Sequence, residues 1–199
     1  QTVLNSDVEY YRIFLERRKN PPQAMDVRRW RRLSDSFKGG SLIDMGCLDS
    51  MIPFMMKSKY PSSEIWGLDQ SKDIIETMAK EYPEIQYTHG DVCDTQFPDA
   101  YFDYVVAGEL IEHLEEPAKF FKEAFRILKP GGTLALTTPR EEEPGGVDEH
   151  RHLWSFSKED IRDLARPYMK GAKISEIPSW VERRISYHHP YLLAIITKQ

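Results

Sequence analysis

The chain has 199 residues, 40% of them hydrophobic and 30% charged, a length that suits one domain and a composition that excludes disordered, collagen-like and low-complexity proteins. Its formal net charge of −5 argues against a protein whose main task is to bind the nucleic-acid backbone. No apolar run reaches the length of a membrane span, no signal-peptide pattern is visible, and the two cysteines form no CxxC pair. We therefore expect a cytoplasmic protein without membrane insertion.

The charge is distributed unevenly along the chain. Residues 1–40 carry nine Lys and Arg against five Asp and Glu, whereas residues 41–140 carry nine against seventeen. An acidic segment suits a cationic ligand better than a phosphate-rich one. The middle of the chain is therefore expected to hold a site for a positively charged ligand.

The predicted elements begin with two amphipathic helices over residues 8–18 and 24–37, separated by the helix breakers Asn20-Pro21-Pro22. After Gly39-Gly40, short apolar strands alternate with helices, an order typical of βαβ units and a parallel sheet. The predicted strands cover residues 41–45, 64–68, 85–89, 102–107 and 133–138. The helices between them cover residues 51–58, 69–82 with an Asp69/Ser71 cap, and 117–128, which ends at the break Lys129-Pro130-Gly131-Gly132.

The last part of the chain changes pattern. Ser157, with Asp160 three residues on, predicts a capped helix to about Arg166. Residues 173–177 and 191–197 are expected to form an antiparallel pair of strands at the sheet edge. The sequence therefore predicts an α/β fold with a doubly wound, mostly parallel seven-stranded sheet and an N-terminal helical cap. We expect a single domain over residues 1–199, with the cap in 1–38 and the core in 39–199.

Acidic residues and glycines follow the predicted strands, and in an open parallel sheet ligands bind beyond the carboxyl ends of the strands. Gly46 in the first turn lets the backbone approach a bound nucleoside, and Asp69 after the second strand can accept from both ribose hydroxyls. Asp91 after the third strand can accept from the exocyclic amine of a base. Asp44 would repel a pyrophosphate and attract an ammonium or sulfonium group, so the pattern predicts a nucleoside ligand with a cationic arm.

The stretch from Phe102 to Pro139 carries, in order, a strand, Glu-x-x-Glu-His, a Pro-led helix, Leu-Lys-Pro-Gly-Gly and a further strand. Together with LIDMG, GLDQS and GDV, it resembles the class I S-adenosylmethionine-dependent methyltransferases of the ubiquinone-biosynthesis-type small-molecule branch, over residues 24–165. The resemblance implies a Rossmann-like methyltransferase fold with S-adenosyl-L-methionine as cofactor. It also implies a set of cofactor contacts: Gly46, Cys47 and Leu48 at the methionine end, with Asp44 at the same turn; Asp69 at the ribose, with Gln70 beside it; Asp91 and Val92 at the adenine; and Gly108 and Glu109 on the sulfonium side.

The first loop departs from the family pattern acid-x-Gly-x-Gly-x-Gly, because Leu48 and Ser50 replace its second and third glycines. A positive φ at Leu48 would cost on the order of 1 kcal/mol or more, so the loop is either re-routed or binds the cofactor less tightly. The sequence thus leaves open a methyltransferase-like binding or scaffold protein with a degenerate loop. A nicotinamide-dependent dehydrogenase is a third alternative, although the glycines are too few for a pyrophosphate cradle.

Three histidines are candidate catalytic residues on the acceptor side, because an imidazole can take a proton from an attacking group near neutral pH. His113 follows the fourth strand by one turn, and His150 and His152 lie in a loop after the fifth strand. The Pro144-Gly145-Gly146 sequence in that loop is typical of a mobile lid. A structural role is an equally good interpretation for each histidine alone. Taken as a group, they predict one histidine that faces the acceptor.

Other residues have simpler interpretations. Cys47 is expected to be a small packing residue, and the basic run Arg28 to Arg32 to form a solvated helix face. No metal is predicted, because the histidines have no matching cysteine pairs. The motifs of DNA amine and cytosine methyltransferases are absent. The predicted function is methyl transfer to an oxygen or nitrogen of a small metabolite or sugar-like acceptor, without nucleic acid as a partner; the oligomeric state stays open.

Overall fold

The structure, a computed structural model, describes residues 19, 24–48, 51–140, 152–177 and 191–199. Its helices are α2 (Ala24–Ser34), α3 (Ile52–Lys59), α4 (Lys72–Glu81), the 3-10 helix η1 (Ile111–His113), α5 (Pro117–Ile127) and α6 (Lys158–Ala165). Its strands are β1 (Ser41–Met45), β2 (Glu64–Asp69), β3 (Gln86–His89), β4 (Phe102–Gly108), β5 (Leu128–Pro139), β6 (Met169–Ile177) and β7 (Tyr191–Lys198). The helix predicted over residues 8–18, the predicted lid and His150 lie outside the described residues.

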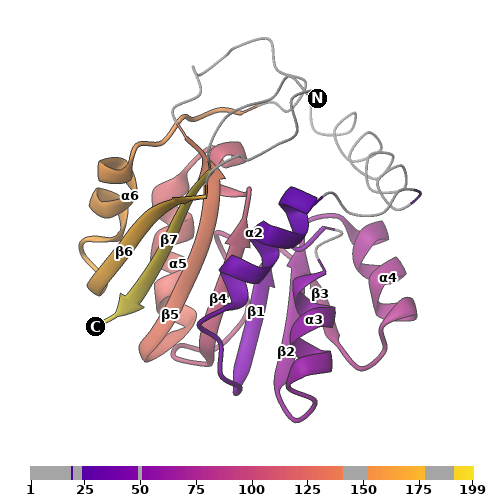
Figure 1. The fold of residues 1–199 in the computed structure, drawn as a ribbon. Helices are drawn as coiled ribbons and strands as arrows, with labels where there is room; N and C mark the ends of the chain where they lie inside the picture. The colour runs from indigo at the N-terminus through magenta and orange to yellow at the C-terminus, as the bar shows by residue number, and fades with distance from the viewer. Residues whose placement is uncertain (1–18, 20–23, 49–50, 141–151, 178–190) are drawn as a thin grey trace.

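The strands of the described chain form one seven-stranded sheet in the order β3-β2-β1-β4-β5-β7-β6 (Figure 1). Strands β1 to β5 are parallel to one another, whereas β7 pairs antiparallel with both β5 and β6. This arrangement confirms the predicted doubly wound, mostly parallel sheet with an antiparallel pair at its edge. The strand order reverses between β1 and β4, which is the place where open α/β sheets bind ligands.

Three predicted boundaries are wrong. Strand β5 starts at Leu128, so the segment predicted as a break belongs to the strand. Gly131 in this segment has a φ of +76°, and the register with β4 shifts between Phe102 and Tyr104, so an irregular stretch absorbs the additional residues. Strand β6 starts before residue 173, at Met169, because its pairing with β7 extends to Lys198. Helix α2 ends at residue 34, before the predicted residue 37.

The core lies on both faces of the sheet, as β4 illustrates. Val105 belongs to a buried cluster with residues of α5 and α6, whereas its neighbours Tyr104 and Val106 belong to a cluster with Leu33 of α2. Successive side chains of a strand point to opposite faces, so α2 and α5 cover opposite sides of the sheet (Figure 1). A strand that is buried on both faces carries consecutive apolar residues, which explains the apolar run Tyr104–Ala107 in β4.

The start of α6 has the predicted cap. The N–H of Asp160 donates to Oγ of Ser157 at 3.2 Å, and the N–H of Ser157 donates to Oδ2 of Asp160 at 2.8 Å. These two bonds satisfy backbone donors that the first turn of a helix leaves without partners. The cap therefore fixes where the chain enters α6 after the loop that contains His152.

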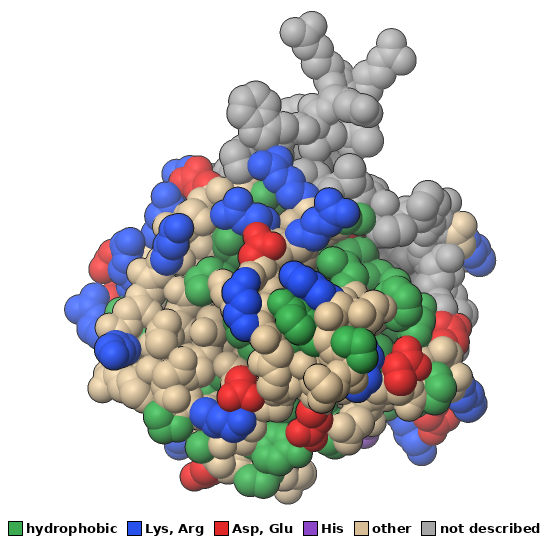
Figure 2. Space-filling view, turned by 60° about the horizontal axis from the view of Figure 1, so that its bottom comes forward, with side chains coloured by type: hydrophobic (Ala, Val, Ile, Leu, Met, Phe, Trp, Pro, Cys, Tyr) green, Lys and Arg blue, Asp and Glu red, His purple; other side chains and the backbone are tan. Residues whose placement is uncertain are grey.

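The surface mixes charges of both signs. Figure 2 shows Lys and Arg side chains near the middle of one face, with Asp and Glu side chains among and around them. Such mixing is typical of a solvated surface. In the part of the chain that the structure describes, no helix combines the length and the apolar character needed to cross a membrane.

A buried carboxylate on α5 is expected to make stability depend on pH. Glu123 is 7% exposed and accepts hydrogen bonds from the N–H of Thr95 at 2.8 Å and from Nη2 of Arg126 at 2.7 Å. Burial alone would raise the pKa of Glu123, but the bonds from Arg126 and Thr95 outweigh burial and lower it below the ordinary 4.5. Because the folded-state pKa is depressed, the stabilisation is complete above pH 4.5 and is lost as the pH falls through the folded-state value.

We therefore expect Glu123→Gln to lower the free energy of unfolding by about 1–3 kcal/mol at pH 7 and to change it little at acidic pH. Denaturant unfolding measured across the acidic range checks this. The control is Glu116→Gln, which removes an exposed ion pair with Lys119 on the same helix and should have no measurable effect. Equal losses at neutral and acidic pH would contradict the electrostatic explanation.

Candidate active site

The carboxyl ends of β1, β2, β3 and β4 meet at one edge of the sheet, at the top in Figure 1, because these strands are parallel. The residues predicted to contact a cofactor lie along this edge. They are Asp44 near the end of β1; Gly46, Cys47 and Leu48 in the turn that follows; Asp69 and Gln70 at the end of β2; Asp91 and Val92 after β3; and Gly108 and Glu109 at the end of β4. The fold thus brings together residues that are far apart in the sequence.

The turn after β1 passes closely over the end of β2. The N–H groups of Gly46 and Cys47 both donate to the carbonyl oxygen of Leu68, at 2.8 and 3.0 Å. Gly46 has a φ of +72°, and a Cβ on it would lie 2.8 Å from a methyl carbon of Leu110. Any larger residue would be strained and would collide, so the turn requires glycine. Cys47 is 1% exposed, as expected for a packing residue.

Asp69 ties this turn to the start of α4. Asp69 is 1% exposed. Its carboxylate accepts hydrogen bonds from the N–H of Leu48 at 3.0 Å and from the N–H of Ser71 at 2.9 Å. Ser71 is the N-cap residue of α4, as predicted, although its side chain makes no capping bond. A carboxylate has about four lone-pair positions, more than these two backbone bonds occupy.

Leu48 adopts a positive φ of +36°, the strained backbone considered for this loop position from the sequence. Its half-buried side chain packs against Ile74 and Met78 of α4. Burial of part of a leucine side chain stabilises by an amount comparable to the cost of a left-handed backbone, on the order of 1 kcal/mol for each. The loop therefore accommodates leucine by packing its side chain against the helix.

The end of β3 presents polar groups to solvent. Asp91 is exposed, and its Oδ1 accepts from the N–H of Cys93 at 2.8 Å. Gln70 is also exposed, and its carbonyl oxygen lies 2.9 Å from Nε2 of His89. Val92, in contrast, is 7% exposed and belongs to the core. An exposed carboxylate at this point can accept hydrogen bonds from an incoming ligand.

After β4 the chain turns at Glu109, which has a φ of +54° and donates its N–H to the carbonyl oxygen of Thr137 at 3.0 Å. Oε2 of Glu109 lies 4.0 Å from Nη1 of Arg29 on α2. Opposite charges at this distance and partly out of solvent attract each other more than a surface pair does. Helix α2 therefore contributes a positive charge to the edge of the sheet.

The solvated helix face predicted for the basic run is wrong for Arg29, although Arg31 and Arg32 are exposed. Arg29 is 8% exposed, forms an ion pair with Asp26 at 3.0 Å, and its guanidinium lies 5.1 Å from the ring centroid of Tyr191. A buried guanidinium needs such partners to offset the loss of hydration. The inward direction of Arg29 is explained by the carboxylates that it meets.

Helix η1 buries Glu112 three residues after Glu109. Glu112 is 1% exposed, and neither of its carboxylate oxygens has a described donor in hydrogen-bond geometry. Burial raises the pKa of Glu112 well above its ordinary value, and the charge of Glu109 adds to the rise, while nearby Thr138 and Arg29 act in the opposite direction. The carboxyl group is therefore poorly compensated in its present surroundings.

Two of the three candidate catalytic histidines come together. The rings of His113, at the end of η1, and His152, before α6, have centroids 4.8 Å apart and meet edge to face. A carboxylate oxygen of Glu112 joins them, because the three side chains place one donor atom each within 4.8 Å of the others. The group of Glu112, His113 and His152 is called the Glu-His-His cluster below.

Hydrogen bonds hold the two segments of the cluster together. The N–H groups of Leu153 and Trp154 both point to the carbonyl oxygen of Glu112, at 2.8 and 3.3 Å. The indole N–H of Trp154 donates to the carbonyl oxygen of Leu114 at 2.7 Å. These bonds join two segments about 40 positions apart in the sequence, at the residues on either side of His113.

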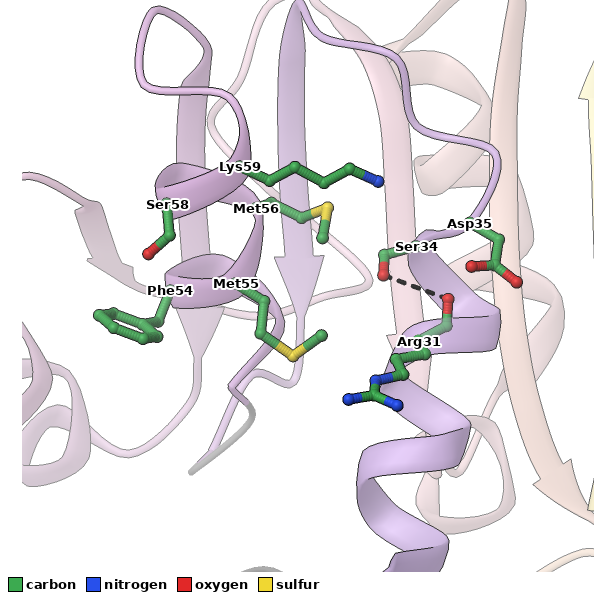
Figure 3. Close-up of a pocket in the computed structure, with 8 residues that line it drawn as sticks. All are labelled: Arg31, Ser34, Asp35, Phe54, Met55, Met56, Ser58 and Lys59. Carbon is green, nitrogen blue, oxygen red and sulfur yellow. Dashed lines mark hydrogen bonds between the residues drawn. The ribbon is translucent and has the colours of Figure 1, made fainter.

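The pocket in Figure 3 lies elsewhere, between α2 and α3, and has a volume of about 460 Å³. Arg31 extends into it from α2, and Met55 and Lys59 extend into it from α3. None of the predicted site residues lines this pocket. It is therefore separate from the carboxyl edge of the sheet.

Sequence reasoning missed Arg29 and Glu112 as members of the site. For Arg29 a signal was present, because it precedes the buried Leu33 by four residues and a helix places such residues on the same face. For Glu112 the sequence shows only the Glu-x-x-Glu-His pattern, which does not reveal which carboxylate is buried.

Comparison with known proteins identifies the family. Residues 43–136 match the family described as a methyltransferase domain. Over 110 residues the chain is 30% identical to a probable S-adenosylmethionine-dependent methyltransferase of Mycolicibacterium smegmatis, a match that covers 55% of the chain and 42% of that relative. Residues 43–136 therefore form a methyltransferase domain similar to that of S-adenosylmethionine-dependent methyltransferases. S-adenosylmethionine is the cofactor of this family.

A second relative and a solved structure extend the comparison. The methyltransferase is 35% identical over 99 residues to a demethylmenaquinone methyltransferase of Lysinibacillus sphaericus, which covers 48% of the chain and 41% of the relative. The chain thus spans less than half the length of the curated relatives it matches. An S-adenosylmethionine-dependent methyltransferase of Thermotoga maritima has the same fold, with a TM-score of 0.73, 20% identity and coverage of 98% of this chain and 97% of that one.

Proposed function

We propose that this methyltransferase transfers a methyl group from S-adenosylmethionine to an oxygen or nitrogen atom of a small-molecule acceptor. The charge at the carboxyl edge of the sheet is the observation that carries the proposal. Three carboxylates lie along this edge, those of Asp44, Asp69 and Glu109, and the guanidinium of Arg29 lies beside Glu109 as a counter-charge. An excess of negative charge in a partly buried site favours a cation such as a sulfonium.

The residues at this edge fit the cofactor one by one. The glycine turn lets the backbone pass close to the methionine end, Asp69 has acceptor capacity for the ribose hydroxyls, and the exposed Asp91 can accept from the adenine amine. When bound, S-adenosylmethionine supplies an activated methyl group. The task left to the chain is to hold the donor, to align the acceptor and to exclude water. We further propose that residues 1–199 belong to one domain, in which residues 1–38 form the helical cap.

The acceptor is proposed to approach beside the Glu-His-His cluster and to carry an apolar part. Leu153 and Trp154 follow His152 and are 49% and 44% exposed, which is unusual for such large apolar side chains. An imidazole of the cluster can take the proton that an attacking hydroxyl or amine loses. The name of one relative, a demethylmenaquinone methyltransferase, supports a small-molecule acceptor.

Titration calorimetry with S-adenosylmethionine tests the proposed function. We expect micromolar binding by the chain as it stands, because the carboxyl edge is assembled without further change. The affinity for S-adenosylmethionine should fall more at high salt than the affinity for S-adenosylhomocysteine, which lacks the sulfonium charge, since only the cation gains from the carboxylates. No detectable binding of S-adenosylmethionine at millimolar concentration would overturn the proposal.

Substitutions of Leu48 distinguish a loop that binds the cofactor from a degenerate loop that does not. We expect Leu48→Gly to change S-adenosylmethionine affinity less than about fivefold, because the leucine side chain is occupied by packing against α4. Leu48→Ala is the matched control, since both variants lose the packing but only glycine relieves the positive φ. Thermal unfolding should therefore find the glycine variant more stable than the alanine variant by about 1 kcal/mol. Binding that appears only in Leu48→Gly would favour a binding or scaffold protein whose loop has lost its cofactor.

A further inference from the structure

We propose that the Glu-His-His cluster binds a divalent first-row transition-metal ion, of the kind represented by Mn²⁺ and Zn²⁺. The donor atoms of Glu112, His113 and His152 lie within 4.8 Å of one another. Ligands that share one ion at about 2.1 Å are separated by about 3–4 Å. Movements of about 1 Å in exposed or half-buried side chains are therefore enough to close the three groups around an ion.

The backbone already holds the ligands in place. His113 and Glu112 are neighbours on η1, and His152 is brought to them from a distant segment by the hydrogen bonds from Leu153 and Trp154. Metal sites require ligands that are positioned before the ion arrives, because ordering them on binding costs free energy. The cluster therefore requires little reorganisation of the chain to accept an ion.

The buried carboxylate of Glu112 is an independent observation that points to a ligand. Glu112 is 1% exposed, its two oxygens have no described donor in strict hydrogen-bond geometry, and the hydroxyl of the adjacent Thr138 compensates its charge only in part. A buried carboxylate without such partners carries a desolvation cost that a bound cation offsets. An oxygen of this carboxylate lies within 4.8 Å of a ring nitrogen of each histidine.

The ligand types select the class of ion. Imidazole nitrogens favour first-row transition metals, whereas Mg²⁺ and Ca²⁺ prefer sites made of oxygen ligands. Three protein ligands leave coordination positions open for water or for an acceptor oxygen. Among the described residues the cluster offers three ligands, as a reactive site does, whereas a closed structural site has four.

The role of the ion rests on the proposed function, although its binding does not. A coordinated acceptor hydroxyl has a lower pKa, so it gives its proton more readily to water, and the two imidazoles then hold the ion rather than take the proton. Its oxygen then forms the bond to the methyl carbon, and the carbon–sulfur bond breaks with its electron pair left on the sulfur. No oxidant or reductant is needed. The acceptor of this chain would then be one that attacks through oxygen.

Titration of the metal-free chain with Mn²⁺, followed by electron paramagnetic resonance, tests the proposal, with Zn²⁺ calorimetry as a second probe. We expect one ion per chain and a loss of affinity of at least about 100-fold in Glu112→Gln and in His152→Gln. The matched control is His89→Gln, because His89 lies at the end of β3, outside the cluster, and should leave the affinity unchanged. Circular dichroism confirms that each variant is folded.

The results separate this proposal from the proposed function. Equal metal affinity in the chain and in the double variant Glu112→Gln/His152→Gln, or no binding at all, would overturn the metal site. Cofactor binding is measured on the metal-free chain, so it can succeed while the metal titration fails. Conversely, a metal that binds to a chain without affinity for S-adenosylmethionine would leave the site standing and remove its proposed role.

Discussion

Replacing Asp69 with asparagine is expected to weaken S-adenosylmethionine binding by about 10- to 100-fold, because hydrogen bonds to a charged group are each worth about 1.5–3 kcal/mol. The carboxylate accepts from Leu48 through one oxygen and from Ser71 through the other. An amide would place a donor against one of these N–H groups. The substitution therefore disturbs the cofactor loop and also removes acceptor capacity for the ribose.

Calorimetric titration with S-adenosylmethionine measures the effect. The matched control is Asp73→Asn, which changes an exposed carboxylate in the first turn of α4 and removes the same charge at a short distance in sequence. We expect the control to bind as the original chain does. Equal losses in both variants would mean that net charge, rather than the hydrogen bonds of Asp69, determines affinity.

The second large effect is expected at Arg29. Replacing it with methionine should lower the free energy of unfolding by about 3 kcal/mol, because removal of one partner leaves buried charges uncompensated. Arg29 is 8% exposed and lies 4.0 Å from Glu109, and its charge also acts on Glu112. Methionine keeps much of the side-chain volume, so loss of packing contributes little to the expected change.

Denaturant unfolding of Arg29→Met beside Arg32→Met checks this expectation, since Arg32 is exposed on the same helix. The exposed substitution should change stability by less than about 0.5 kcal/mol. If the two variants lose the same amount, the inward ion pairs of Arg29 do not stabilise the fold. If Arg29→Met also weakens S-adenosylmethionine binding, α2 helps to shape the cofactor edge.

The alternation of strands and helices made most of the fold predictable, because the apolar strands of a two-sided sheet are short and bounded by polar turns. The same regularity made the strand ends predictable as a group: parallel strands must bring Asp44, Asp69 and Asp91 to one edge. The start of β5 was not predictable, because Lys129-Pro130-Gly131-Gly132 has the composition of a turn, and only pairing with β4 extends the strand through it.

The interior of the site was less predictable than its outline. Arg29 stands among other arginines, so local charge indicates a solvated helix, and only the position of Glu109 in space reverses that interpretation. The contact between His113 and His152 depends on hydrogen bonds between distant segments, which no local pattern encodes. Both residues were recognised as candidates from their places after strands, but their proximity is a property of the tertiary structure.

The position of β7 has a consequence for how the chain is made. β7 lies between β5 and β6 in the sheet. β6 therefore joins the sheet only by pairing with β7, a strand that is synthesised later than β6. Until residues 191–198 have left the exit tunnel, the long strand β5 keeps an unpaired edge of backbone N–H and carbonyl groups. Such an edge can pair with other nascent chains, and its closure depends on contacts between distant residues, which form slowly. Completion of this side of the sheet is thus a late event in folding, when protection by a chaperone matters most.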